Sequence, residues 1–200
     1  MFAPNYIMIY GTALFSDTLI AGLHSDDLLL PALHLRSMLT FIFAVGGDSF
    51  DIAASCSGGR RDDRCFSARF MWRTDGKGEI YTYLPPDYSA NKAVCNVAPE
   101  SECNETYGAS VGRGSFYFKA GGRTTIGQRV RLNDLGQENG EIELFVEGKS
   151  IFTVKGLVLR TSSQGKFQGI QMQTFFGGAS ALRHCCFERL LTDCFDRLQL

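Results

Sequence analysis

Short runs of alternating apolar and polar residues fill the chain from residue 65 onward, and glycine-rich turns separate them. These runs lie at residues 66–73, 79–84, 114–119, 124–132, 141–147, 150–159 and 167–176. Successive side chains of a strand point to opposite faces, so each run predicts a strand with one buried face. Many short strands separated by turns indicate an all-β fold, either a sandwich or a barrel.

The first two runs predict a hairpin, because Asp75-Gly76 between them is a strong turn signal. Its apolar face should join the core, together with Leu144 and Met172, and comprises Phe66, Ala68, Phe70, Trp72, Ile80, Thr82 and Leu84. Its second face carries Ser67, Arg69, Met71, Tyr81 and Tyr83. A five-residue connection would set Arg69 opposite Tyr83 and Met71 opposite Tyr81.

The second face is the first candidate for a functional site. An arginine beside phenols can hold a carboxylate and move a proton next to it. The alternative is packing alone, since arginine and tyrosine are common cross-strand partners on solvated sheet faces.

The two ends of the chain differ from this pattern and suggest three segments, 1–45, 46–180 and 181–200. Residues 1–45 are apolar but do not alternate, and neither end is expected to offer a strand to the sandwich. Charged residues and Pro31 interrupt the apolar stretches, which argues against a stable membrane span. The first residues carry no positive charge, so no clear signal peptide is predicted.

Charge and residue spacing narrow the function classes. The formal net charge of −1 argues against a nucleic-acid partner. The seven cysteines form no CxxC motif and the three histidines (His24, His34 and His184) lie outside the alternating region, so no metal site or cofactor is expected.

Four of the cysteines flank polar loops and predict two disulfides, Cys95–Cys103 and Cys56–Cys65. Cys185, Cys186 and Cys194 should stay unpaired. Asn104-Glu105-Thr106 is a glycosylation acceptor pattern beside the first pair. Together these features favour an oxidising compartment, and the alternative is a cytosolic protein with reduced thiols.

Several ordered blocks between residues 46 and 179 resemble polysaccharide lyase family 14, particularly its fungal members. The blocks are CSGGRRDDRCFSARFMWRTDGKGEIYTYLP, SVGRGSFYFKAGG, GQRVRLND, NGEIELFVEGK, GLVLR and GIQMQTFFGG. The resemblance implies an antiparallel, concanavalin-like jelly-roll β-sandwich, secreted and active without a cofactor. It also implies cleavage of an acidic polysaccharide, such as alginate or glucuronan, by β-elimination. We expect a monomer.

The family places Ser-x-Arg on one strand of its site and Tyr-x-Tyr on the next. Ser67-Ala68-Arg69 and Tyr81-Thr82-Tyr83 match that pattern. By this resemblance Arg69 clamps the substrate carboxylate, Ser67 donates a hydrogen bond, and Tyr81 or Tyr83 serves as base and acid. The phenols could do so if positive charge lowered their pKa. Further candidate substrate contacts are Gln171, Gln173, Arg129 and Arg131.

The chain departs from the family where a catalytic lysine is expected. The family has a Gly-Gly-Lys-Leu-Pro-Gly strand before the Gly-Gly-Asp motif, whereas this chain has FIFAV before Gly46 and no lysine before Lys77. A non-catalytic carbohydrate-binding sandwich or an inactive lyase is therefore an alternative. A glycoside hydrolase that uses Glu141, Glu143 and Glu147 is another, but these residues read better as solvated glutamates of a plain hairpin.

Overall fold

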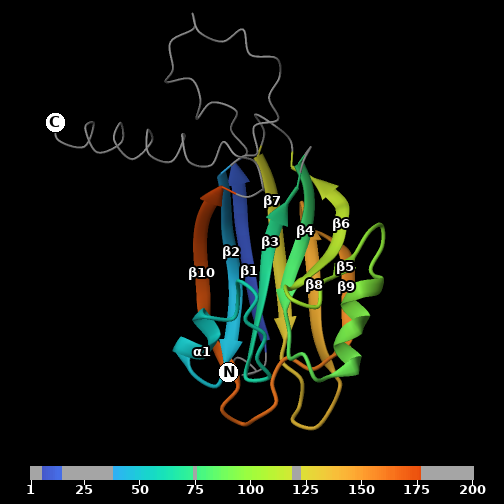
Figure 1. Ribbon diagram of the computed structural model, residues 1–200. Coiled ribbons are helices and arrows are strands. Elements are labelled where there is room, and N and C mark those ends of the chain that lie inside the picture. The colour runs from blue at the N-terminus through green and yellow to red at the C-terminus, as the bar shows by residue number, and fades with distance from the viewer. Residues whose placement is uncertain (1–5, 15–37, 74–75, 119–122, 177–200) are drawn as a thin grey trace, which may run out of the picture.

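The structure, a computed structural model, describes residues 6–14, 38–73, 76–118 and 123–176 and consists of two antiparallel sheets (Figure 1). The four-stranded sheet has the order β1-β7-β8-β9, and the six-stranded sheet has the order β10-β2-β3-β4-β6-β5. The strands are β1 (Tyr6–Leu14), β2 (Met38–Gly47), β3 (Cys65–Trp72), β4 (Lys77–Tyr83), β5 (Glu102–Cys103), β6 (Ala109–Tyr117), β7 (Arg123–Arg131), β8 (Gly140–Val146), β9 (Lys149–Leu157) and β10 (Lys166–Phe176). The helices are α1 (Phe50–Ala54) and the 3-10 helix η3 (Ser89–Asn96). This confirms the predicted all-β antiparallel sandwich.

Two strands come from the segment that was expected to contribute none. β1 pairs with β7 along its whole length, and β2 lies between β10 and β3 in the six-stranded sheet. The prediction for residues 1–40 is wrong for these two stretches, and the proposed boundary at residue 45 falls inside β2. Alternation marks only strands with one solvated face, so a continuous apolar run can equally be a strand covered on both sides. The tail 181–200, with its three cysteines, lies outside the described residues.

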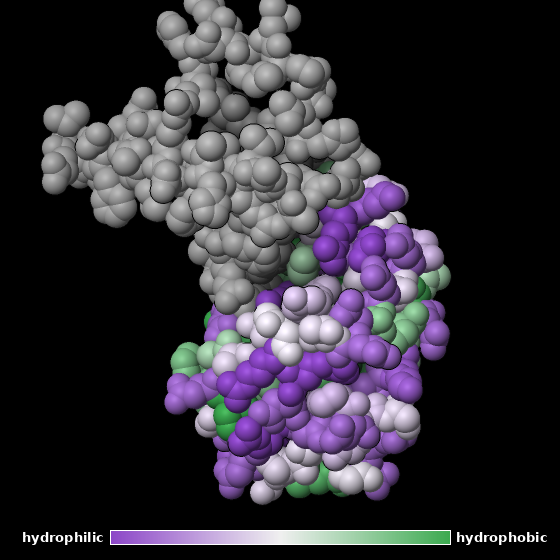
Figure 2. Space-filling view, in the orientation of Figure 1, coloured by the Kyte–Doolittle hydropathy of each residue, from purple (hydrophilic) through white to green (hydrophobic). Residues whose placement is uncertain are grey.

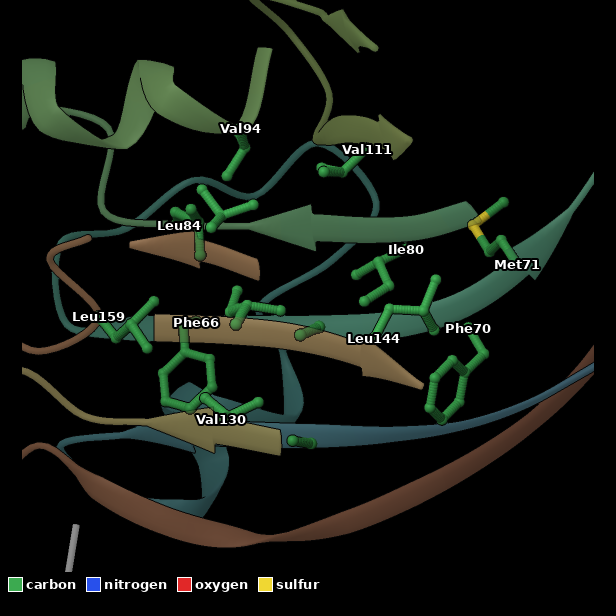
Figure 3. Packing of buried hydrophobic residues seen from close by; sticks show 14 of the residues in the cluster. Phe66, Phe70, Met71, Ile80, Leu84, Val94, Val111, Val130, Leu144 and Leu159 are labelled. Atoms are coloured by element: carbon green, nitrogen blue, oxygen red, sulfur yellow. The ribbon is translucent and has the colours of Figure 1, made fainter. Parts of the chain in front are cut away.

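The core lies between the sheets and is built from the apolar face predicted for the hairpin. Phe66 extends toward Val130 of β7, and Phe70 lies beside Leu144 of β8 (Figure 3). Ile80 and Trp72 are also buried, which confirms the face assignment, while the side chain of Met172 lies outside the described part. The described surface in the view of Figure 2 is mostly hydrophilic.

The hairpin register differs from the prediction by two residues. Ser67 pairs with Tyr83, Arg69 with Tyr81 and Met71 with Glu79, so the predicted Arg69–Tyr83 and Met71–Tyr81 pairings are wrong. The turn is tighter than expected, because the Arg73 N–H donates to the Lys77 carbonyl at 2.8 Å and Gly76 takes a φ of 71°. A shift of two residues preserves the face of every side chain, so the predicted site face survives it.

Disulfides join Cys56 to Cys65 and Cys95 to Cys103, with Cα–Cα distances of 6.0 and 5.5 Å. The first holds the loop that follows α1 against the start of β3. The second ties the end of η3 to β5. Among the described residues, no helix has the length and apolar character needed to cross a membrane.

Replacing both Cys56 and Cys65 by serine should lower the free energy of unfolding by about 2–3 kcal/mol, because the unfolded chain gains the freedom of an opened loop. Urea titration of the wild type and the double variant measures this difference. A reducing agent should lower the urea midpoint of the wild type more than that of the variant, which retains only one disulfide. Equal midpoints for the two proteins without reductant would show that this bond constrains nothing.

Candidate functional site

One cross-strand row of residues runs over the six-stranded sheet and contains three of the predicted site residues, Gln171, Arg69 and Tyr81. Consecutive register pairs join Gln171 of β10, Phe43 of β2, Arg69 of β3, Tyr81 of β4 and Ser110 of β6. Directly opposed residues of an antiparallel pair share one face of the sheet. Neighbouring strands lie about 4.8 Å apart, so Gln171 and Ser110 stand roughly 10 Å to either side of Arg69. An extended ligand that lay along this row would cross five of the six strands, all except β5.

Ser67 and Arg69 both donate to one backbone carbonyl. The Ser67 hydroxyl donates to the Cys56 oxygen at 2.8 Å, and Arg69 Nη2 donates to the same oxygen at 3.1 Å. Both side chains are buried under the disulfide loop, and burial lowers the pKa of Arg69 below its usual value, against the opposing effect of Tyr83 and Tyr81. The carbonyl dipole presents a partial negative charge at the position where the prediction places a carboxylate.

The two tyrosine rings lie against each other and beside arginines. Their centroids are 5.8 Å apart, the Arg69 guanidinium lies 5.4 Å from the centre of the Tyr83 ring, and that of Arg73 lies 5.8 Å from the Tyr81 ring. The Tyr83 hydroxyl accepts a hydrogen bond from the Gly59 N–H at 3.1 Å. Arginine over a phenol ring is a favourable cation–π arrangement, so these contacts hold the rings in place and set a positive charge beside each of them.

Burial, together with the neighbouring Tyr83, raises the pKa of Tyr81 to about 12, although Arg73 acts in the opposite direction. The expectation that positive charge lowers the phenol pKa is therefore wrong for Tyr81. The desolvation of a half-buried phenol outweighs the nearby guanidinium. Tyr81 is protonated across the physiological range, which suits it to donate a proton rather than to take one.

Sequence reasoning missed a buried carboxylate on the same face. Glu79 is fully buried, and its oxygens accept hydrogen bonds from Arg73 Nε at 3.0 Å, Arg113 Nε at 2.9 Å and the Ser110 hydroxyl at 2.6 Å. The register steps from Gly78↔Phe116 to Ile80↔Val111, so Glu79 alone stands opposite residues 112–115 of β6.

This bulge in β6 turns Arg113 toward Glu79. Gly112 and Gly114 flank Arg113 and take φ values of 63° and 80°, a region that favours glycine. The sequence Gly-Arg-Gly was the available signal, because glycine on both sides of an arginine inside a strand pattern indicates a bulge.

Two cavities open beside the tyrosine pair. The first, of about 260 Å³, includes Tyr81, Arg73, Ser110 and Arg113 in its lining, and the second, of about 310 Å³, includes Tyr83 and Arg61. The loop that carries Asn104, Tyr107 and Gly108 borders both. Its sequon residue Asn104 is exposed, and whether it carries a glycan stays a prediction.

The four remaining predicted substrate contacts lie on two different sheets. Gln171 belongs to the cross-strand row, and Gln173 pairs in register with Phe41 one step further along, with its side chain outside the described part. Arg129 and Arg131 lie on β7 of the other sheet and face away from the core, because Val130 between them and Gln128 before them are fully buried. They are not brought to the site.

Those two arginines instead pair with the glutamates of β8. Arg129 Nη2 lies 2.6 Å from Glu143, and Arg131 Nη1 lies 3.6 Å from Glu141. Glu143 is buried rather than solvated as expected, because the ion pair and a hydrogen bond from Ser150 compensate the lost hydration. Glu147 accepts from the Thr125 N–H at the strand end. All three glutamates thus have structural partners, which disfavours a hydrolase site there.

Among the described residues no group of His, Cys, Asp and Glu side chains is arranged to hold a metal ion. This face carries guanidinium, phenol, hydroxyl and amide groups together with the buried carboxylate of Glu79.

The raised pKa of Tyr81 predicts a pH dependence of stability. Below pH 10 both the folded and the unfolded chain keep this proton, so its contribution is fully present. Stability is lost as the pH rises from about 10, the ordinary value, through about 12, because the unfolded chain releases the proton first. Tyr81→Phe should therefore lose less stability than the wild type between pH 9 and pH 11, as measured by urea midpoints. The exposed Tyr117→Phe is the matched control, and an equal pH response of all three proteins would contradict the assignment.

Comparisons with known proteins place this geometry in context. The family model Polysaccharide lyase 14 matches residues 44–182. The solved structure of the PL-14 alginate lyase from Aplysia kurodai is similar with 31% identity and a TM-score of 0.57, over 72% of this chain and 63% of that one. The alginate lyase vAL-1 from Chlorella virus has the same fold at 22% identity and a TM-score of 0.53, over 72% of this chain and 64% of that one.

The chain thus spans less than two thirds of the length of these two solved lyases. Comparison with curated proteins yields no match. The family match nevertheless covers more than half of the chain and includes β3 and β4, with all four residues of the Ser-x-Arg and Tyr-x-Tyr pattern. This protein belongs to polysaccharide lyase family 14.

Proposed function

We propose that this chain binds an acidic polysaccharide, of the alginate or glucuronan class, across the six-stranded sheet and cleaves it by β-elimination. The observation that carries the proposal is the juxtaposition of Arg69 with Tyr81 and Tyr83 on adjacent strands, in the middle of the cross-strand row. The solved relative from Aplysia kurodai, which is named an alginate lyase, supports the substrate class.

β-Elimination makes three demands on a site. The substrate carboxylate must be neutralised so that the C5 proton becomes acidic, a base must remove that proton, and an acid must protonate the departing glycosidic oxygen. Arg69 neutralises the carboxylate through its planar fork of donors. The C5–H electron pair then forms the new C4–C5 double bond as the C4–O bond breaks.

The two phenols take different parts in this proposal. Tyr81, whose pKa of about 12 keeps it protonated, gives its proton to the leaving oxygen. Tyr83 is the base, because the Gly59 N–H and the Arg69 guanidinium stand next to the phenol that becomes negative when it loses its proton. Ser67 orients the carboxylate, and Gln171 and Gln173 contact further sugar units along the row.

Access to Arg69 requires a rearrangement of the disulfide loop. The Cys56 carbonyl accepts from Ser67 and Arg69 where the substrate carboxylate would accept. An entering carboxylate, which carries a full charge, is a stronger acceptor than this carbonyl. On substrate binding, Ser67 and Arg69 would thus exchange the Cys56 carbonyl for the substrate carboxylate, which is the stronger acceptor.

A non-catalytic carbohydrate-binding role is the second candidate, and it rests on the strand beside Arg69. The residue that stands opposite Arg69 in β2 is Phe43, and no lysine precedes Lys77 in the chain. The family's lysine strand is thus present as backbone but carries apolar residues. Loss of one proton carrier or cation commonly costs about 100-fold or more in rate, whereas binding persists.

The two disulfides and the exposed sequon support a secreted protein with Asn104 as the glycan acceptor. We further propose that it acts on extracellular polymer as a monomer. The lyase domain in this proposal includes β2 and extends to the end of β10.

Arg69→Ala should abolish binding of an alginate or glucuronan oligosaccharide, because it removes the carboxylate clamp. Tyr83→Phe should spare binding and remove the cleavage that is present, because it deletes only the hydroxyl that exchanges the proton. Calorimetry measures binding, and absorbance near ~235 nm detects the unsaturated product that elimination makes and hydrolysis does not.

Arg129→Gln, on the other sheet, controls for the loss of one positive charge. If the wild type neither binds nor cleaves any uronic-acid polymer, the proposed function falls. If Tyr83→Phe cleaves at the wild-type rate, Tyr83 is not the base.

Phe43→Lys should raise the rate of unsaturated-product formation by about 100-fold, since Phe43 stands opposite Arg69 in β2 and lysine there adds a cation beside Arg69. Phe43→Gln separates the effect of the charge from that of losing the aromatic ring. A wild type that cleaves as fast as the lysine-bearing variant would show that the lysine is dispensable here.

A further inference from the structure

An exposed aromatic ring, Tyr107, lies at the border of both cavities beside the tyrosine pair. Tyr107 is 52% exposed, yet it contributes to the cavity of Tyr81 and to the cavity of Tyr83. The residue after it, Gly108, packs so tightly that a Cβ there would lie within 3.0 Å of both the Tyr81 and the Tyr83 ring. The backbone of Tyr107 is thus fixed directly beside the two phenols.

The loop around Tyr107 is held from three sides. The Asn104 side-chain oxygen accepts hydrogen bonds from the N–H groups of Thr106 and Tyr107 at 2.8 and 2.9 Å. The Cys95–Cys103 disulfide fixes its start, and Arg61 Nη1 donates to the Glu105 carbonyl at 2.9 Å. A preformed aromatic surface loses little conformational entropy when a ligand covers it.

The two arginines at the cavity on the Tyr81 side are bound to three carboxylates. Arg113 donates to three carboxylates, those of Glu79, Glu100 and Glu102, and Arg73 shares Glu79 with it. The carboxylates thus outnumber the guanidiniums, so this cavity has no surplus positive charge for a second uronate carboxylate. It offers donors and acceptors side by side, which is what sugar hydroxyls require, since each is both donor and acceptor.

We propose that Tyr107 is a stacking platform for one sugar ring of the polysaccharide, next to the unit held at Arg69, and that the adjoining cavity takes the hydroxyl groups of that ring. The apolar C–H face of a pyranose covers the ring of Tyr107, which would otherwise remain in water. This subsite rests on the proposed function, and it reads ring shape and hydroxyls rather than charge.

A subsite that binds ring shape and hydroxyls rather than charge can be tested by substitutions of Tyr107 and by the salt dependence of binding. Tyr107→Ala should weaken binding of an alginate pentasaccharide about tenfold, because the buried face of one aromatic ring is lost. Tyr107→Phe keeps that face and should bind within about twofold of the wild type. The slope of log affinity against log salt should be unchanged in Tyr107→Ala, because screening acts on charges and the subsite uses none. Tyr117→Ala removes an equally exposed tyrosine, 57% exposed, that lines neither cavity, and it should have no effect.

The outcomes separate the subsite from the proposed function. Suppose that Arg69→Ala abolishes binding, but Tyr107→Ala and Tyr117→Ala bind equally well. That result would overturn the subsite and leave the proposed function standing. A reduced salt slope in Tyr107→Ala, or failure of Tyr107→Phe to retain affinity, would show that the residue acts through polar contacts and would also overturn the proposal. Absence of any wild-type binding would overturn both.

Discussion

The carbonyl oxygen of Cys56 connects the parts of this molecule that matter for its site. It accepts hydrogen bonds from Ser67 and Arg69, two residues of one strand face, while the side chain of the same cysteine forms the disulfide to Cys65 at the start of that strand. A covalent bond and two hydrogen bonds thus hold one loop over the outer face of β3. The strand is therefore buried on both faces, one against the core and one against this loop. The polar side chains of the site are ordered before any ligand arrives.

Burial on both faces explains the electrostatics of the site. A charged guanidinium is tolerated there because the Cys56 carbonyl and the Tyr83 ring lie against it. The same desolvation keeps Tyr81 protonated, so one phenol of the pair is suited to give a proton. Glu79 is a second buried charge on this face. Its carboxylate accepts hydrogen bonds from two arginines and a hydroxyl, and the bulge in β6 supplies one of those arginines.

The outer faces of the two sheets differ in the groups that they present. The six-stranded sheet carries the cross-strand row, both disulfide-held loops and both cavities, whereas the described outer face of the four-stranded sheet binds its arginines to its own glutamates. An acidic polymer would find an arginine on either sheet. On the six-stranded sheet, Arg69 lies against the phenol ring of Tyr83 and stands opposite Tyr81 in register.

The sequence by itself determined the sandwich, the two faces of the hairpin and the grouping of Ser67, Arg69, Tyr81 and Tyr83, because alternation depends only on the period of a strand. It also indicated both cysteine pairs, since short loops leave few partners. Only the tertiary structure decided the register of the hairpin, because the turn is tighter than its sequence implied. It also decided the partners of Glu79, because a bulge in β6 turns Arg113 toward that carboxylate. It also decided that residues 6–14 and 38–47 are strands and that Arg129 and Arg131 belong to the other sheet. Periodicity states which way a side chain points along its own strand, but which strand lies beside it is set by long-range pairing that no local pattern records.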